Sequence, residues 1–247
     1  MPTVGELART SYVRASRTGR SIADRTGLLE RLDRSYRRDR SSVGGHLRTL
    51  FAIYDVEDLI DLDVPWWTYP AIEIVERHLA ALGGKARVFE YGSGASTVWL
   101  ASRSAEVTSV EHDAGFAEVM RTVLSRAGLT DTTRLLEVPP VPSAAPLVPS
   151  ERKGEQGRDY ADYVASIEST EGEFDLVVVD GRARVACMDA AVRRLAPGGL
   201  VLFDDSQRPR YRAGIEASGM RVRRLRGWAP SLPYPRETAV LDVQGRA

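Results

Sequence analysis

Apolar residues follow two different periods along this chain of 247 residues, and the change falls near residue 63. Upstream, in the segments 28–36 and 47–54, they recur three and four positions apart, which places them on one face of an α-helix. Downstream, helical periodicity alternates with short segments that are apolar at nearly every position. The pattern therefore predicts a helical N-terminal region at 1–62 and a second domain at 63–247.

The apolar segments of the second domain are typical of strands that are buried on both faces. The five expected strands are 86–92, 105–113, 133–138, 173–181 and 199–206. Strands of this kind alternating with amphipathic helices predict an α/β fold, with a Rossmann-like, doubly wound and mostly parallel sheet. Two further segments, 219–228 and 237–244, predict a closing pair of strands. Between the third and fourth strands, residues 138–160 are proline-rich and polar, which indicates a lid or mobile loop.

Composition narrows the class of protein. Lysine and arginine balance aspartate and glutamate at 34 each, so overall charge gives no reason to expect a nucleic-acid partner. Cys187 is the only cysteine, which excludes disulfide frameworks and indicates a cytoplasmic protein. No apolar run is long enough for a transmembrane segment. The arginine-rich N-terminal helices are a candidate surface for a homo-oligomer, and the preference for arginine over lysine suggests a bacterial sequence.

The segment VFEYGSGAST places Gly92 and Gly94 directly after the first strand and before a helix expected near Ala95. In an open parallel sheet, ligands bind outside the carboxyl ends of the strands, and glycines in the first turn let a ligand approach the backbone. The unpaired N–H groups of the following helix favour a carboxylate or phosphate. Glu111 ends the second strand, about 20 residues further on, where a carboxylate accepts the hydroxyl protons of a ribose.

Two residues of the turn narrow the ligand further. Thr97 stands where a dinucleotide-binding turn has its third glycine, which weakens the case for NAD. Glu90 precedes the turn, where a carboxylate repels a pyrophosphate and attracts an ammonium group. Ribose, carboxylate and ammonium together describe an amino-acid nucleoside.

At this point the chain resembles the class I S-adenosylmethionine-dependent methyltransferases. FEYGSGAST, VTSVEHD, FDLVVVDG and LAPGGLVLFDD are similar to four of their motifs, in order, and the resemblance covers residues 65–243. It implies a reversed edge strand in the sheet. It also implies a set of cofactor-binding residues: Glu90 at the ammonium, Gly92 and Gly94 at the methionine moiety, Glu111 at the ribose, and Ser96, Thr97, His112 and Asp180 nearby.

Three carboxylates follow the fourth and fifth strands: Asp180, Asp204 and Asp205. The carboxyl ends of neighbouring parallel strands meet at one edge, so these side chains are expected to converge. Oxygen ligands of this kind suit Mg²⁺, as the resemblance to metal-dependent O-methyltransferases of catechols and sugar rings also implies. In the alternative, no metal binds, Arg182 or Arg184 pairs with the carboxylates, and Asp180 acts as the base. We count Arg184 among the catalytic candidates.

The leading function is therefore O-methylation of a small-molecule hydroxyl, on a sugar or phenol. Two alternatives are a nicotinamide-dependent oxidoreductase, which Thr97 disfavours, and a non-catalytic nucleoside-binding module. The sequence PWWTYP, with Trp66 and Trp67, predicts an aromatic wall over the pocket or, alternatively, packing of the N-terminal region.

Overall fold

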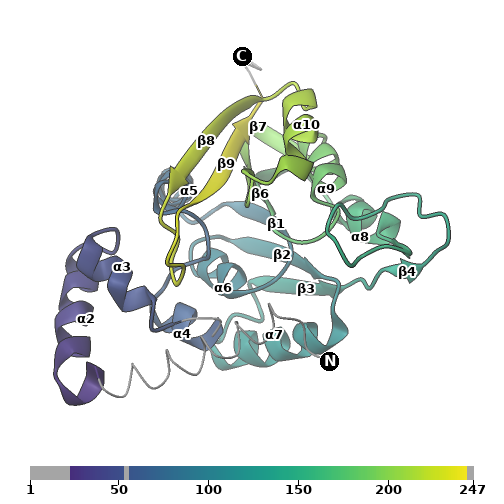
Figure 1. The fold of residues 1–247 in the computed structure, drawn as a ribbon. Coiled ribbons are helices and arrows are strands. Elements are labelled where there is room, and N and C mark those ends of the chain that lie inside the picture. The colour runs from purple at the N-terminus through teal and green to yellow at the C-terminus, as the bar shows by residue number, and fades with distance from the viewer. Residues whose placement is uncertain (1–22, 53–55, 244–247) are drawn as a thin grey trace.

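The computed structural model describes residues 23–52 and 56–243. Its centre is a seven-stranded sheet with the order β3-β2-β1-β6-β7-β9-β8 (Figure 1). The parallel strands are β1 (Arg87–Tyr91), β2 (Glu106–Glu111), β3 (Thr133–Glu137), β6 (Phe174–Val179) and β7 (Leu195–Phe203). All five lie within or beside the segments that the apolar pattern predicts, so the predicted mostly parallel α/β fold is confirmed.

The closing strands are β8 (Arg221–Gly227) and β9 (Arg236–Asp242). β9 inserts between β7 and β8 and runs antiparallel to both. The resemblance implied a reversed strand at the edge of the sheet. The reversed strand is one place further in, and β8 forms the edge.

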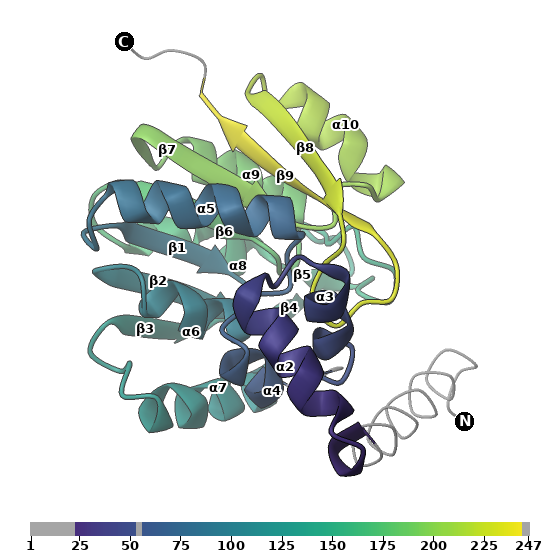
Figure 2. The ribbon, with the colours of Figure 1, turned by 90° about the vertical axis from the view of Figure 1, so that its left-hand side faces the viewer.

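Helices cover both faces of the sheet because successive strand residues point to opposite sides (Figure 2). On one face, Val88, Leu176 and Val178 pack with α5 (Tyr69–Ala81) and α6 (Ala95–Ala101). On the other face, Phe89, Val177 and Val179 pack with the second set of helices. This set consists of α8 (Ala161–Ala165), α9 (Arg184–Val192) and α10 (Pro209–Ala217).

The remaining helices are placed by smaller apolar clusters. α7 (Ala114–Arg126) packs on α6 through Met120, Val123 and Leu124. A 3-10 turn, η1 (Ser166–Ser169), follows α8. Pro197-Gly198-Gly199 lies inside β7.

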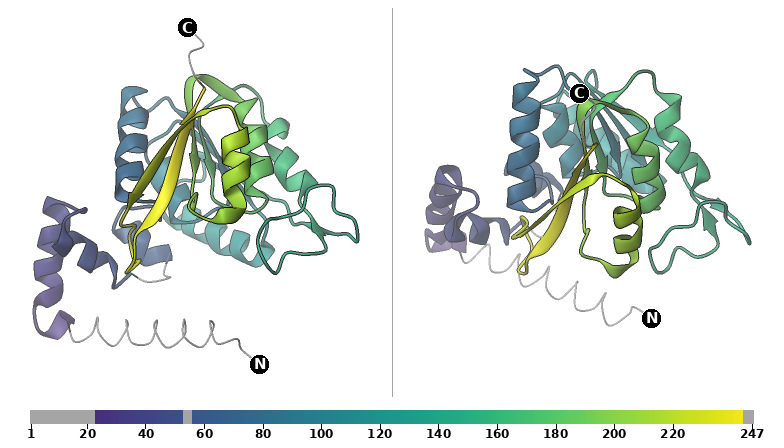
Figure 3. Two further views of the ribbon diagram at one scale, coloured as in Figure 1. Left: turned by 45° about the horizontal axis from the view of Figure 1, so that its top comes forward. Right: turned by 90° about the horizontal axis from the view of Figure 1, so that it is seen from above.

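Helices α2 (Leu28–Arg38), α3 (Val43–Thr49) and α4 (Val56–Asp61) precede α5 (Figure 3). The predicted helical segment 47–54 extends into residues 53–55, which lie outside the described residues. α4 packs against α6 through a cluster that includes Leu59, Leu62 and Ala95. The N-terminal region therefore reaches the first turn after β1.

Residues 138–160 fold back beside α8 and α9. Val141–Pro142 (β4) and Arg158–Asp159 (β5) form a short antiparallel pair, visible at the right of Figure 1. Glu151 accepts a hydrogen bond from the backbone N–H of Val185, at the start of α9, across 3.2 Å. Within the described ranges, no helix is long and apolar enough to cross a membrane.

The order of the strands reverses between β1 and β6, which are neighbours although four strands separate them in the sequence. At such a point the loops after the two strands leave in opposite directions and open a crevice. Gly92 follows β1 and Asp180 follows β6, so both lie at this crevice.

Candidate cofactor and acceptor cavities

The two loops of the crevice touch at Gly92 and Gly181. Gly92 has φ +96°, a value that side chains rarely adopt, and a Cβ there would lie 2.8 Å from the Cα of Gly181. The amide of Asp180 donates to the carbonyl of Tyr91 across 2.9 Å. At Gly94, by contrast, an added Cβ would meet open space. Close backbone approach therefore requires glycine at 92, and the turn leaves free volume at 94.

Glu90 is fully buried beneath this turn. Its carboxylate accepts hydrogen bonds from the hydroxyls of Thr97 (2.6 Å), Ser109 (2.7 Å) and Ser96. The Thr97 hydroxyl also accepts from the amide of Gly94 across 2.9 Å. Burial raises the pKa of Glu90 to about 7. Glu90 thus holds the turn from below and lines neither cavity beside it, and its expected contact with a ligand ammonium group, directly or through water, stays a prediction.

Glu111 lies on the open side of the turn and is only 3% exposed. Oε2 accepts from the amide and hydroxyl of Ser93 at 3.2 and 2.8 Å. Oε1 accepts from the amides of His112 and Asp113 at 2.8 and 2.9 Å, and His112 Nδ1 lies 2.7 Å away. Burial by itself raises the pKa of Glu111, but the hydrogen bonds from His112 and Asp113 outweigh it and hold the pKa below its usual value.

Two cavities flank this turn. The glycine cavity, about 220 Å³, has an apolar wall formed by α4 and two aromatic side chains. Its lining is Val56, Leu59, Trp66, Gly92, Ser93, Gly94, Ala95, Ser96, Phe116 and Asp180. The Glu111 cavity, about 330 Å³, lies beside it. Its lining is Gly92, Ser93, Glu111, His112, Asp113, Phe116, Asp180, Gly181 and Arg182.

A third cavity, the arginine cavity, has a volume of about 430 Å³ and opens past the ends of β6 and β7. Its lining includes six arginines, Arg152, Arg182, Arg184, Arg208, Arg210 and Arg236. The rest of the lining is Trp66, Asp180, Gly181, Asp204, Asp205, Tyr211, Leu232 and Tyr234. Asp180 borders all three cavities, and Trp66 borders the glycine and arginine cavities.

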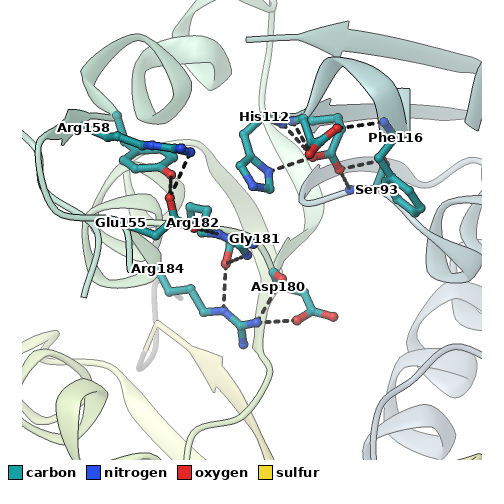
Figure 4. A network of polar contacts seen from close by, with 12 residues as sticks. Ser93, His112, Phe116, Glu155, Arg158, Asp180, Gly181, Arg182 and Arg184 are labelled. Carbon is teal, nitrogen blue, oxygen red and sulfur yellow. Dashed lines mark hydrogen bonds and ion pairs between the residues drawn. The ribbon is translucent and has the colours of Figure 1, made fainter. Parts of the chain in front are cut away.

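Arg184 fixes the position of Asp180 (Figure 4). Its Nη2 donates to Asp180 Oδ1 across 2.7 Å and to the Asp180 carbonyl across 2.9 Å. The same guanidinium donates to the carbonyls of Gly181 (3.2 Å) and Asp204 (2.6 Å). Within the described residues, Asp180 Oδ2 accepts no hydrogen bond. One carboxylate oxygen of Asp180 is therefore held in place and the other is available.

Comparison with known proteins identifies the segment that carries these residues. A family profile described as "Methyltransferase domain" matches residues 89–206, which include the turn, Glu111 and all three aspartates. Residues 89–206 are therefore a methyltransferase domain, and the sheet around them has the class I methyltransferase fold. No curated protein gives a significant sequence match to this methyltransferase.

Solved structures share its fold. An O-methyltransferase from Bacillus cereus, in complex with SAH, is 18% identical, with a TM-score of 0.51 over 76% of this chain and 90% of that one. The O-methyltransferase TomG from Streptomyces achromogenes, in complex with SAM, is 17% identical, with a TM-score of 0.54 over 80% and 90%. A cofactor-bound protein from MTB is 21% identical, with a TM-score of 0.55 over 84% and 94%.

The three aspartates of the methyltransferase do not form one set of metal ligands. Within the described part of the chain, no group of three or more histidine, cysteine or acidic side chains is arranged to hold a metal ion. Asp205 forms ion pairs with Arg208 and Arg236. Asp204 accepts a hydrogen bond from Thr238 across 2.8 Å, and burial, together with the charge of Asp180, raises its pKa to about 7. In this arrangement the three aspartates do not fit the predicted Mg²⁺ site. Arginines supply the positive charge beside Asp180 and Asp205.

The other predicted residues divide between the cavities and the core. Ser96 and His112 border cavities, whereas Thr97 is buried against Glu90. Of the two tryptophans, Trp66 borders two cavities, but Trp67 is buried and packs on Trp99. Sequence reasoning missed Phe116, which borders two cavities from the first turn of α7. It also missed four of the six cavity arginines, which come from three separate segments of the sequence: Arg152, Arg208, Arg210 and Arg236.

Proposed function

We propose that this methyltransferase transfers the methyl group of S-adenosylmethionine to a hydroxyl oxygen of a small molecule, such as a sugar or phenol, with Asp180 as the base. The observation that carries the proposal is the position of Asp180, which borders both cavities of the glycine turn and the arginine cavity. A cofactor in the first two and an acceptor in the third would meet at this carboxylate.

The surroundings of Glu111 support a ribose in the Glu111 cavity. Three backbone amides orient its carboxylate, and these contacts are independent of any ligand. Two further donors, the Ser93 hydroxyl and the His112 ring, belong to side chains that can rotate away. The two hydroxyls of a ribose would take their places without leaving Glu111 short of partners. Phe116 and His112 supply flat surfaces for a base beside it.

The glycine cavity suits the methionine part of the cofactor. Val56, Leu59 and Trp66 give it an apolar wall for the aliphatic chain, and the open space at Gly94 leaves the backbone accessible. Ser96 borders the cavity and is held by Glu90. Glu90 thus acts as a positioning residue, through Ser96 and through the Thr97 hydroxyl that fixes Gly94.

Bound S-adenosylmethionine supplies an electrophilic methyl group on a sulfonium sulfur. Transfer of this methyl group to the acceptor oxygen would break the sulfur–carbon bond, and the acceptor would lose a proton. Asp180 Oδ2 receives that proton, since Arg184 occupies Oδ1. Because its pKa is raised, Asp204 is largely protonated below pH 7. In that pH range it does not repel the ionised carboxylate of Asp180. No step passes through a metal.

The test uses the full chain with S-adenosylmethionine carrying a labelled methyl group and pools of hydroxylated small molecules. Asp180→Asn should lower methyl transfer by about 10²–10⁴-fold, the usual contribution of a general base. S-adenosylhomocysteine affinity, measured by calorimetry, should change by less than about threefold, because Asn has nearly the same shape. Asp131→Asn, on an exposed turn, is the matched control. Full activity in Asp180→Asn would show that Asp180 is not the base. Failure of S-adenosylhomocysteine to bind the wild type would contradict the proposed methyltransferase function.

A further inference from the structure

The arginine cavity has a strong excess of positive charge. Six arginines line it, against three aspartates. They come from five places in the fold: the 138–160 loop, the start of α9, the start of α10, the turn after β6 and strand β9. A solvated helix face places its charges along one element, whereas here separate segments direct theirs toward one volume. An open cavity lined by this excess of positive charge attracts an anion.

The ion pairs within the cavity leave part of this charge uncompensated. Arg184 is paired with Asp180 at 2.7 Å, and Arg182 is paired at 3.3 Å with Glu155 from the 138–160 loop (Figure 4). Arg208 and Arg236 share the single carboxylate of Asp205.

Two arginines of the cavity take no part in these ion pairs. Within the described residues, neither Arg152 nor Arg210 forms an ion pair with a carboxylate. Partial burial and the nearby charge of Arg182 lower the pKa of Arg152, as burial and the charge of Arg184 do for Arg208. The guanidinium groups therefore repel one another, and an anion between them would relieve that repulsion.

We infer that the acceptor of this methyltransferase carries a phosphate group, bound by Arg152, Arg210 and the Arg208–Arg236 pair, in addition to the hydroxyl that is methylated. The inference rests on the proposed function. A phosphate has three free oxygens and up to two charges, so it can accept from several guanidinium groups at once. A carboxylate has two oxygens and one charge, which a single arginine satisfies.

The other walls of the cavity suit the body of such an acceptor. Trp66, Tyr211 and Tyr234 give it aromatic surface, and a volume of about 430 Å³ is in the range of small-molecule sites. Asp180 borders the side that joins the cofactor cavities, so the reacting hydroxyl belongs there. A phosphorylated sugar or a similar hydroxylated phosphate ester has both groups on one molecule.

The first experiment measures binding of inorganic phosphate to the full chain by calorimetry, at constant ionic strength and with S-adenosylhomocysteine present. Arg152→Ala/Arg210→Ala should weaken phosphate binding by at least about tenfold, since two charged donors are lost. Neither residue forms an ion pair within the described ranges, so the variant is expected to fold. Arg134→Ala, at an exposed position of β3, should bind phosphate like the wild type. Equal binding by the wild type and the double variant, or equal competition by chloride, would overturn the inference.

The second experiment compares methyl transfer to sugar monophosphates with transfer to the corresponding free sugars. We expect transfer to phosphorylated acceptors, with a KM that rises at least about tenfold in Arg152→Ala/Arg210→Ala while S-adenosylhomocysteine affinity stays unchanged. Preference for the free sugars, or for carboxylated or sulfated acceptors, would overturn the inference that the acceptor carries a phosphate. The proposed methyltransferase function would be unaffected. Failure of S-adenosylhomocysteine to bind the wild type would instead contradict the proposed function.

Discussion

Arg184 and Asp180 are joined twice: the same guanidinium nitrogen donates to the side-chain carboxylate at 2.7 Å and to the backbone carbonyl at 2.9 Å. Because Arg184 also donates to the carbonyls of Gly181 and Asp204, it ties the end of β6 to the end of β7. One buried side chain therefore sets both the orientation of the proposed base and the spacing of two strand ends.

Arg184→Ala should consequently damage both stability and turnover. Breaking a fully buried ion pair typically costs about 3–5 kcal/mol, and since Asp180 is partly exposed, this range is an upper bound here. We expect a loss of up to this size in the free energy of unfolding, measured with urea. Arg193→Ala, at an exposed position just after α9, serves as the control and should change stability by less than about 1 kcal/mol. Unfolding of the two variants at the same urea concentration would contradict the structural role of Arg184.

Glu111→Ala should weaken cofactor binding without unfolding the sheet. The ribose hydroxyls would lose a charged acceptor, and the backbone amides that now orient Glu111 would lose theirs. Such a loss costs about 1–3 kcal/mol, or about 5- to 150-fold in affinity. Calorimetric titration with S-adenosylhomocysteine measures it. Glu137→Ala, at the end of the neighbouring strand β3 and outside all three cavities, should bind like the wild type. An unchanged affinity in Glu111→Ala would contradict the assignment of the ribose to the Glu111 cavity.

Glu90 makes stability depend on pH. Its pKa is about 7 in the folded protein, above the ordinary value of 4.5, so the folded state binds the proton more tightly than the unfolded chain. Its stabilising contribution is complete below about pH 4.5 and is lost as the pH rises through 7. Glu90→Gln cannot ionise, so its stability relative to the wild type should rise by up to about 3 kcal/mol between pH 4.5 and pH 8.

Urea unfolding at a series of pH values, without cofactor, measures this difference. Glu173→Gln, at an exposed position, should follow the wild type at every pH. Parallel curves for Glu90→Gln and the wild type would show that the buried carboxyl keeps an ordinary pKa.

Chelation by EDTA distinguishes a bound metal ion from the neighbouring arginines as the positive charge beside the aspartates. Since Arg184, Arg208 and Arg236 already pair with Asp180 and Asp205, methyl transfer should be the same with and without EDTA. The measurement is the initial rate after dialysis against the chelator, with added MgCl₂ in a parallel sample. Loss of activity in EDTA that magnesium restores would mean that the aspartates rearrange around a metal, contrary to the arrangement described above.

The sequence predicts the sheet well because each parallel strand is a short run of apolar residues, and burial on both faces makes such runs distinctive. Helices α4, α8 and α10 were not predicted individually. In α4, Glu57, Asp58 and Asp61 obscure the apolar residues Val56, Leu59 and Ile60, which share one helical face. In α10, only Tyr211 and Ile215 are buried, and two positions are too few to establish a period.

The candidate site was predictable only where it is local in the sequence. Gly92, Gly94 and Glu111 belong to motifs whose spacing has a physical reason, so they could be recognised. The arginine cavity is different, because Arg152 and Arg236 are separated by 84 positions and meet only through the fold. The pairing of Asp205 with Arg236 depends on β9 inserting beside β7, which no local pattern specifies.

The position of α4 couples the N-terminal helices to the ligand. Val56 and Leu59 form part of the wall of the glycine cavity, and α4 packs on α6 directly beyond the turn. A molecule that binds this cavity contacts both α4 and the sheet, so its binding energy opposes their separation. Saturation with S-adenosylhomocysteine should therefore slow amide hydrogen exchange and proteolytic cleavage in α4 as well as at the turn after β1. Slower exchange and cleavage in the N-terminal helices would then indicate that the cofactor is bound.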